Sequence, residues 1–381
     1  MIWVRLVRAI QKSYRYRIQA SACRRFRGFM KAHIVLAVSD VEKKLNRSIR
    51  SYQEIENSAE DLLTDGAESI LIEGNQIKDP LFTQDYWTNG IQSFWLANKR
   101  LPSKNYNEKA GALTSAITTC LALGNSIKDT IVIAEMFVNR EIRHAKNIDK
   151  LDLSNWPENE IDLPFLSTKP LLNLPKPFKH CQLGLYPVVD SYHWLELLLP
   201  TGVKCIQLRI KDSNRTLLEE EIKRAVSLAK SFDATLFIND YWELALQFGA
   251  DGVHLGQDDL HEADIDKIHQ AGLFLGVSSN CYYEVARAHA LNPSYIACGA
   301  IYPTTSKVMS SEPQGIADLK RWRRTLNYPL VAIGGISFAK LPEILETGVE
   351  GIALISAITK ADDPIIATRK FLSKIKEFND S

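Results

Sequence analysis

Three polar side chains alternate with aliphatic ones in one short segment of the chain. Gln207, Arg209 and Lys211 are separated by single aliphatic residues within 206–211. If this segment is a β-strand, its period of two places the amide, the guanidinium and the ammonium on one face. Burying these groups is costly unless an anionic or polar ligand meets them. A solvated edge strand with incidental charges is the alternative. The aliphatic opposite face, which helices should cover, favours the ligand site.

Carboxylates follow two later apolar segments. Asp240 ends the segment that begins at Thr235, and Asp258 and Asp259 come soon after the segment 252–255. Carboxylates at the ends of neighbouring strands can converge on one hard cation. Mg2+ takes few of them, because phosphate oxygens and water complete its coordination. Asp is also a common helix N-cap after a strand. We expect a Mg2+ site that includes Asp240, with Asp258 and Asp259 as alternatives for the second ligand.

Three more segments have the composition of phosphate-binding loops. The segment 302–307 contains two threonines, a serine and a lysine, and Gly334-Gly335 and Ile355-Ser356 follow two further apolar runs. Glycine allows a phosphate to approach backbone N–H groups closely. An exposed polar turn would have a similar composition. Together with the basic strand and the carboxylates, these loops predict Mg2+-assisted handling of a diphosphate and of a second phosphorylated substrate.

Nucleophilic catalysis is not indicated. His254 lies inside an apolar run, where we expect a hydrogen-bonded core histidine and not a ligand or general base. We find no Ser–His–Asp or Cys–His constellation, no GxGxxG motif and no P-loop in the sequence.

The elements that must position these residues form a regular pattern. Eight short apolar runs alternate with amphipathic stretches such as 217–232 and 317–326. This alternation is typical of an α/β protein, and the count of eight favours a (β/α)8 TIM barrel over a doubly wound sheet. In that barrel, reactive groups lie at the C-terminal ends of the strands. The expected strands are 185–189, 205–210, 235–238, 252–255, 273–277, 295–302, 330–336 and 351–358.

The chain divides into four predicted parts. Residues 1–31 form a basic head, 32–145 a smaller α/β segment, 146–180 a linker with five prolines, and 181–381 the barrel. The head contains nine Lys or Arg residues and no acid, which is typical of an organellar transit peptide or of an RNA- or membrane-binding arm. We favour a disordered start without function.

Composition restricts the class of protein. Apolar residues make up 45% and charged residues 24% of 381 residues, a balance typical of a soluble globular protein of two to three domains. Outside the head, 37 basic residues face 45 acidic ones, which argues against nucleic-acid binding. No segment is apolar enough to predict a membrane span. Six cysteines without CxxC spacing favour a reducing compartment, and we expect a cytoplasmic protein.

From Gly184 to the C-terminus the chain closely resembles the thiamine-phosphate synthase family. The resemblance implies that the chain condenses 4-amino-2-methyl-5-(diphosphooxymethyl)pyrimidine with a thiazole phosphate, releasing diphosphate. Eight motifs carry it, in family-like order: Ile206–Asp212, Phe237–Asp240, Gly252–Asp259, Leu275–Ser278, Tyr302–Lys307, Pro313–Gly315, Ile333–Ile336 and Ile355–Ile358.

The resemblance also implies a role for each site residue. Asp240 and Asp259 would bind Mg2+, and Arg209, Lys211 and Lys307 would be the catalytic cations. The pyrimidine diphosphate would contact Gln207, Leu208, Arg209, Ile210, Lys211, Asn239, Ser278 and Lys307. The thiazole phosphate would contact Thr304, Thr305, Ser306, Gly335, Ile355 and Ser356.

The motifs depart from the family at two positions. Ile210 stands where Glu is more usual and should point outward, and Ser306 stands where Thr is commoner but keeps the hydroxyl. A thiazole tautomerase-like barrel and a non-catalytic phosphate-ligand sensor are the alternative functions. The complete Gln207, Arg209 and Lys211 face with its aspartates favours the synthase, because a tautomerase has no diphosphate to bind.

Residues 32–145 resemble the C-terminal part of a hydroxymethylpyrimidine-phosphate kinase, a ribokinase-like protein. The similarity lies in Val41–Asn46, Ile70–Gly74 and Leu113–Ile117. Where the kinase has a Gly-x-Gly-Cys anion hole, this chain has 108–111 (Glu-Lys-Ala-Gly), and the kinase's N-terminal half is absent. We therefore expect no kinase activity. A half sheet should expose an edge strand, so we also expect docking or self-association, with a homo-oligomer as one form.

Overall fold

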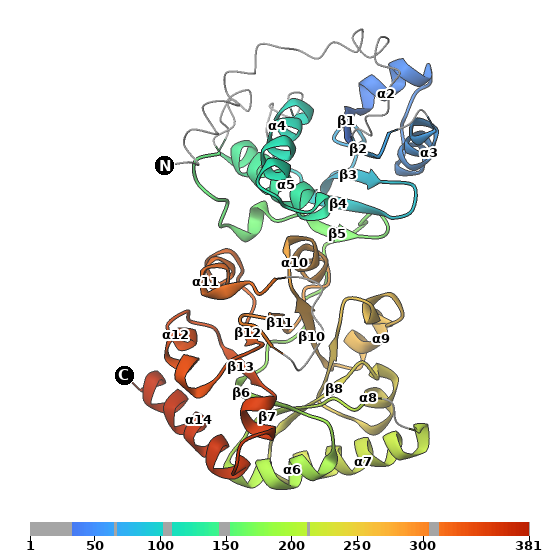
Figure 1. Cartoon of the computed structure of the whole chain (residues 1–381). Helices are drawn as coiled ribbons and strands as arrows, with labels where there is room; N and C mark the ends of the chain where they lie inside the picture. Colours follow the sequence, from blue (N-terminus) through green and yellow to red (C-terminus); the bar gives the residue numbers. More distant parts are fainter. Residues whose placement is uncertain are drawn as a thin grey trace. The chain divides into compact units, whose positions relative to one another are not determined.

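The computed structural model describes residues 33–64, 67–101, 109–144, 153–211, 214–304 and 312–380. The chain forms two compact units (Figure 1). Unit 1 comprises Met1–Pro157 and Ile161–Leu174, and unit 2 comprises Glu158–Glu160 and Pro175–Ser381.

Unit 2 is a closed barrel of eight parallel strands, which confirms the predicted (β/α)8 fold (Figure 1). Each strand pairs with the next along the chain, and β13 pairs with β6 to close the barrel. The strands are β6 (Gly184–Val189), β7 (Cys205–Leu208), β8 (Thr235–Asn239), β9 (Gly252–Leu255), β10 (Phe274–Ser279), β11 (Tyr295–Cys298), β12 (Leu330–Ile333) and β13 (Gly351–Leu354).

Helices of unit 2 surround this barrel (Figure 1). The predicted amphipathic stretches 217–232 and 317–326 lie mainly in α7 and α11. The side chain of Asn214 caps the N-terminus of α7, which buries Leu218, Ile222 and Ala225. The helices are α6 (Tyr192–Leu198), α7 (Arg215–Ser231), α8 (Trp242–Phe248), α9 (Ile265–Gln270), α10 (Tyr282–His289), α11 (Gly315–Thr325), α12 (Leu341–Leu345), α13 (Ser356–Thr359) and α14 (Pro364–Asn379).

Aromatic rings fill the interior of the barrel. Tyr295 packs edge-on against Tyr186 and Phe237, with ring centroids 5.9 Å and 5.3 Å apart. Gly276 on the neighbouring strand makes room for Tyr295, because a Cβ at that position would lie 2.1 Å from the tyrosine ring. Residue types on two adjacent strands are therefore matched by size.

Unit 1 contains a five-stranded mixed sheet in the order β1-β2-β3-β4-β5. β1 pairs parallel with β2, and the other neighbours are antiparallel. The elements are β1 (His33–Ala37), α2 (Val38–Leu45), α3 (Tyr52–Leu63), β2 (Ser69–Glu73), β3 (Phe82–Thr88), β4 (Ser93–Lys99), α4 (Lys109–Ala122), α5 (Ile127–Arg143) and β5 (Phe165–Ser167).

Part of the segment predicted as a linker belongs to this sheet. β5 lies within 146–180 and pairs with β4 through Trp95, Leu96 and Ala97. The prolines at 164 and 170 flank the strand and lie outside it, so they leave its backbone hydrogen bonds intact.

Two further observations concern the class of protein. No helix in the described part of the chain is long and apolar enough to cross a membrane. The five cysteines with described positions are all free thiols: Cys120, Cys181, Cys205, Cys281 and Cys298.

Candidate active site

A cavity of about 570 Å³ opens at the C-terminal ends of the barrel strands. All eight strands supply lining residues, from Tyr186 on β6 to Ala353 on β13. Because parallel strands end on the same side of a barrel, residues far apart in the sequence meet here. Active sites of TIM barrels normally lie at this end of the strands.

The cavity brings together most of the predicted site residues that have described positions. Those that line it are Gln207, Arg209, Lys211, Asn239, Asp240, Asp259, Ser278, Thr304 and Ile355. Gly335 and Ser356 line a smaller hollow that shares Thr304 and Ile355 with the main cavity.

The remaining predicted residues divide into two groups. Leu208 and Ile210 do not line the cavity. Leu208, the last residue of β7, is buried and points away from the interior because successive side chains of a strand alternate in direction. Thr305, Ser306 and Lys307 lie outside the described residues.

Asp240 and Asp259 form a carboxylate pair at the cavity wall. Burial, the charge of Asp259 and a hydrogen bond with it raise the pKa of Asp240 to about 6, and Arg209 and Lys211 oppose that rise. Asp259 Oδ2 also accepts the Gly256 backbone N–H at 3.1 Å. Two carboxyls this close repel each other when ionised, so the pair suits a divalent cation.

The backbone at Asp240 is unusual. Its φ is +64°, in the left-handed region that few residues other than glycine adopt, and its N–H donates to the His254 carbonyl at 3.0 Å. This conformation directs the chain sharply out of β8 toward α8. Asp258 also lines the cavity but is exposed, and Asp259 is the residue that contacts Asp240.

The Asp240–Asp259 pair is not part of a larger group of acidic, histidine or cysteine side chains among the described residues. No group of three or more His, Cys, Asp or Glu side chains that could hold a metal occurs among them. A cation bound by Asp240 and Asp259 would need further oxygen ligands, which amide or backbone carbonyls, a substrate or water can supply.

A chain of buried hydrogen bonds runs beneath the cavity. Gln207 Nε2 donates to Tyr186 Oη at 2.9 Å, and the Tyr186 and Tyr295 hydroxyls are 2.8 Å apart. Tyr295 Oη lies 2.7 Å from His254 Nδ1, and His254 Nε2 lies 2.8 Å from Ser278 Oγ. His254 is thus hydrogen-bonded through both ring nitrogens, as expected. The two tyrosines were not predicted, because they read as ordinary aromatic core residues of apolar strands.

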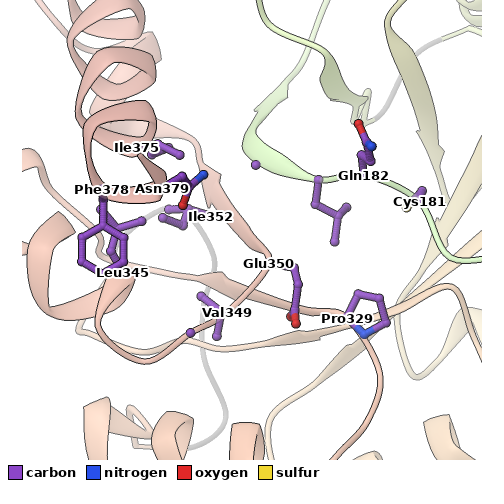
Figure 2. A pocket seen from close by; sticks show the side chains of 13 residues that line it. Cys181, Gln182, Pro329, Leu345, Val349, Glu350, Ile352, Ile375, Phe378 and Asn379 are labelled. Atoms are coloured by element: carbon purple, nitrogen blue, oxygen red, sulfur yellow. The ribbon is translucent and has the colours of Figure 1, made fainter. Parts of the chain in front are cut away.

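A second cavity, of about 470 Å³, lies at the opposite ends of the strands (Figure 2). Ile375 and Phe378 of α14 border it on one side and Gln182, just before β6, on the other (Figure 2). Its one acidic residue, Glu350, accepts hydrogen bonds from Arg323 at 2.7 Å and from the Leu330 N–H at 2.8 Å. The Glu350 carboxylate therefore stabilises the fold through these hydrogen bonds, and none of the predicted site residues lines this cavity.

Comparison with known proteins matches the two units to two families. The sequence model described as thiamine monophosphate synthase matches residues 185–358, and the one described as phosphomethylpyrimidine kinase matches residues 18–155. The thiamine-phosphate synthase of Photorhabdus laumondii is 54% identical over 205 residues, which cover 52% of this chain and 94% of that protein. The chain belongs to the thiamine-phosphate synthase family.

Two further proteins are similar to this chain. The thiamine-phosphate synthase of Yersinia pestis is 53% identical over 196 residues, covering 51% of this chain and 91% of the relative. A solved thiamine phosphate pyrophosphorylase from Pyrococcus furiosus is 31% identical, with a TM-score of 0.47, and covers 52% of this chain and 97% of its own. Both predicted resemblances, to the synthase family and to the kinase, are confirmed.

In the kinase-like unit, the first turn of α4 is occupied by the chain's own charges. Lys109 is fully buried, and its Nζ lies 2.5 Å from Asp85 Oδ2 and 3.1 Å from a Glu135 carboxylate oxygen. The backbone N–H of Ala110 donates to Glu73, another buried carboxyl. A donor that a helix N-terminus could offer to a phosphate is thus already used.

Proposed function

We propose that this chain is a thiamine-phosphate synthase. It would join 4-amino-2-methyl-5-(diphosphooxymethyl)pyrimidine to a thiazole phosphate and release thiamine phosphate and diphosphate. Membership of the family supports the reaction. The observation that carries the proposal for this chain is that Gln207, Arg209 and Lys211 share one cavity with the Asp240–Asp259 pair.

The basic side chains would bind the leaving group. Arg209 and Lys211 lie just beyond β7, close enough to Asp240 for their charges to lower its pKa. Their cations would neutralise diphosphate oxygens as negative charge develops on them. Asp240 and Asp259 would hold Mg2+, which when bound supplies further charge stabilisation to the diphosphate. Gln207 and Asn239 would orient the pyrimidine ring.

The reaction requires that the two substrates be positioned correctly, and it needs little proton transfer. The bond between the pyrimidine methylene carbon and the diphosphate oxygen breaks, and diphosphate leaves with the bonding electrons. The aminopyrimidine ring delocalises the positive charge left on the methylene carbon. The thiazole nitrogen then forms the new C–N bond with its own lone pair, so no general base is required. The hydrogen-bonded His254 is consistent with this chemistry.

The smaller hollow suits the thiazole phosphate. Gly335 has a φ of +65°, and a Cβ there would lie 2.5 Å from the Pro303 carbonyl oxygen, so only glycine fits. Thr304 and Ser356 contribute hydroxyls beside it. Backbone N–H groups and hydroxyls of this kind can bind a phosphate in the loops after the last barrel strands.

We also propose that unit 1 has no kinase activity. The Ala110 N–H is engaged by Glu73, and Lys109 is committed to Asp85 and Glu135, so the α4 N-terminus offers little to a transferred phosphate. Incubation of the chain with ATP, Mg2+ and hydroxymethylpyrimidine phosphate should yield no diphosphate product. Formation of that product at any rate above a no-enzyme control would contradict this part of the proposal.

The synthase proposal is tested by product formation from the two substrates. The intact chain should form thiamine phosphate when Mg2+ is present, and product formation should stop when the metal is removed by chelation. A folded chain that forms no product would move support to the alternatives. Isomerisation of a thiazole carboxylate would then indicate a tautomerase, and thiazole phosphate binding without turnover would indicate a sensor.

A further inference from the structure

The buried hydrogen-bond chain connects Gln207, which the proposed function places on the pyrimidine ring, with Ser278, which the family resemblance places on the pyrimidine diphosphate. Gln207 on β7 and Ser278 on β10 are its ends, and both line the cavity. Tyr186, Tyr295 and His254 connect them from β6, β11 and β9. The two tyrosines are almost completely inaccessible to solvent. We call these five residues the relay.

The orientation of the Gln207 amide sets the direction of every bond in the relay. The Gln207 amide nitrogen donates to Tyr186 Oη, so the single Tyr186 hydroxyl proton is available for Tyr295. Tyr295 then has its own proton to donate to His254 Nδ1. With this direction, a neutral His254 imidazole carries its proton on Nε2, which donates to Ser278 Oγ. If Tyr295 instead donated to Tyr186, the buried Tyr186 hydroxyl would accept from both Gln207 and Tyr295, and its own proton would have no acceptor in the relay.

Burial supports this arrangement of protons. It raises the pKa of both Tyr186 and Tyr295 well above the usual value, so both hydroxyls stay protonated. The hydroxyl proton of Ser278 is not needed within the relay and can donate to a ligand atom in the cavity. At the other end, Gln207 has its Oε1 left to accept a hydrogen bond.

The direction of the relay depends on the orientation of the Gln207 amide. If that amide were rotated by 180°, its oxygen would face Tyr186 and each bond could reverse. Ser278 would then donate to His254 and would present only lone pairs to the cavity. The two ends are thereby coupled: a ligand that donates to Gln207 favours the state in which Ser278 also donates.

We propose that the relay is a specificity device that presets Gln207 as an acceptor and Ser278 as a donor, with Tyr295 as its central positioning residue. It would select a ligand that carries a donor group, such as a ring amino group, together with an acceptor such as a diphosphate oxygen. This reading of the ligand rests on the proposed function; the direction of the relay does not.

The chain offers a matched control for a test by mutation. Tyr295→Phe removes the buried hydroxyl that contacts His254 Nδ1. Tyr328→Phe removes an equivalent hydroxyl elsewhere in unit 2, because the Tyr328 hydroxyl lies 2.9 Å from His289 Nδ1. Tyr328 and His289 do not line the cavity. Tyr295→Phe should lower kcat/KM for the pyrimidine diphosphate about tenfold, as expected for one lost hydrogen bond. Tyr328→Phe should not change it.

A double-mutant cycle tests whether Tyr295 acts through Ser278. In a Ser278→Ala background the end of the relay is missing, so Tyr295→Phe should cause much less than its tenfold effect. Full additivity of the two substitutions would overturn the proposal, since it would mean that Tyr295 supports activity by packing alone.

The tautomer of His254 tests the relay even if the chain makes no thiamine phosphate. Nitrogen NMR of the intact chain at pH 8, with the His254→Gln variant to assign the signal, should show the proton on Nε2. In Tyr295→Phe the signal should move toward a mixture of tautomers. A His254 with its proton on Nδ1 in the intact chain would overturn the relay, whereas missing synthase activity with the expected tautomer would overturn only the proposed function.

Discussion

At the scale of single residues, the candidate site combines opposite charges that would be unstable apart. The negative charges of Asp240 and Asp259 repel each other, which favours binding of a cation between them. The positive charges of Arg209 and Lys211 in the same cavity favour binding of an anion. The Mg2+ and the diphosphate of the proposed reaction would together neutralise both sets of charges. The left-handed φ of Asp240 is the kind of sparsely populated conformation that is found at functional sites.

The charge of Lys211 should matter for binding of the diphosphate. Lys211→Met keeps the aliphatic stem and removes the ammonium, so KM for the pyrimidine diphosphate should rise about 10- to 100-fold, the range for a lost charge-assisted hydrogen bond. Lys204→Met is the matched control, because Lys204 lies just before β7, outside the cavity, and its ammonium contacts the Phe232 carbonyl at the end of α7. Steady-state kinetics check both variants. Equal effects from the two lysines would show that only net charge matters.

The sequence predicts the charged and amide side chains that line the cavity but not the buried tyrosines that contact them. Gln207, Arg209 and Lys211 were predicted because polar residues at every second position of an apolar strand need an explanation. Tyr186 and Tyr295 were missed because a tyrosine in an apolar strand has the pattern of a core residue. Their hydroxyl partners lie on strands that are distant in sequence, so only the barrel closure shows them.

At the scale of elements, the α4 helix of unit 1 begins at a buried ion cluster. Lys109, its first residue, contacts Asp85 on β3 and Glu135 on α5, and Asn98 on β4 donates to Glu135 at 3.2 Å. One lysine therefore connects two strands and two helices through its partners. Buried carboxylates are tolerated here only because a cation and hydrogen bonds compensate them.

Removal of this lysine should destabilise unit 1. Lys109→Met leaves the buried carboxyls without their cation and should lower the free energy of unfolding of unit 1 by about 3–5 kcal/mol. Lys43→Met, at a lysine whose side chain is 79% exposed on α2, should have little effect. Hydrogen exchange of the intact chain reports on the two units separately. Unchanged exchange in 109–143 of Lys109→Met would contradict the proposed role of the cluster.

Element prediction was most successful where the pattern repeats. The eight barrel strands follow from apolar runs that alternate with amphipathic helices. In unit 1, β3 is wholly buried but contains Thr83, Gln84 and Asp85, so it lacks the apolar run of a buried strand. Those polar groups bind within the unit, for example Gln84 with the Leu171 backbone, which no local pattern indicates.

At the scale of the whole molecule, the two compact units carry different chemistry. The barrel contains the candidate active site, and the kinase-like unit contains a buried charge cluster whose groups pair with one another. The fold class of both units was predictable from sequence, whereas the boundary near β5 was not, because its prolines resemble those of a linker.

The stability of unit 1 should fall as the pH rises. Burial, and then the charge of Asp85, raise the pKa of Glu73 to about 8, against an ordinary value near 4.5. A group whose pKa is raised in the folded state contributes stability that is complete below its unfolded pKa and is lost as the pH rises through its folded pKa. The free energy of unfolding of unit 1 should therefore decrease between pH 5 and pH 9.

A variant tests the origin of this dependence. Glu73→Gln cannot ionise, so it should flatten the decline with pH, whereas Glu68→Gln, at an exposed position nearby, should not. Denaturant unfolding of the intact chain at several pH values, followed by exchange within 69–99, provides the measurement. An equally steep decline in Glu73→Gln would assign the effect to other groups.

In the proposed function, the Asp240–Asp259 pair serves Mg2+-dependent synthesis of thiamine phosphate. The most direct measurement compares product formation by the intact chain with that by Asp240→Asn and Asp233→Asn. Asn tolerates a positive φ, and Asp233, with a φ of +50°, is an exposed match outside the cavity. Asp240→Asn should lose about 100-fold or more of the Mg2+-dependent rate, and Asp233→Asn should lose none. An intact chain without product, or an Asp240→Asn variant with full activity, would contradict the claim.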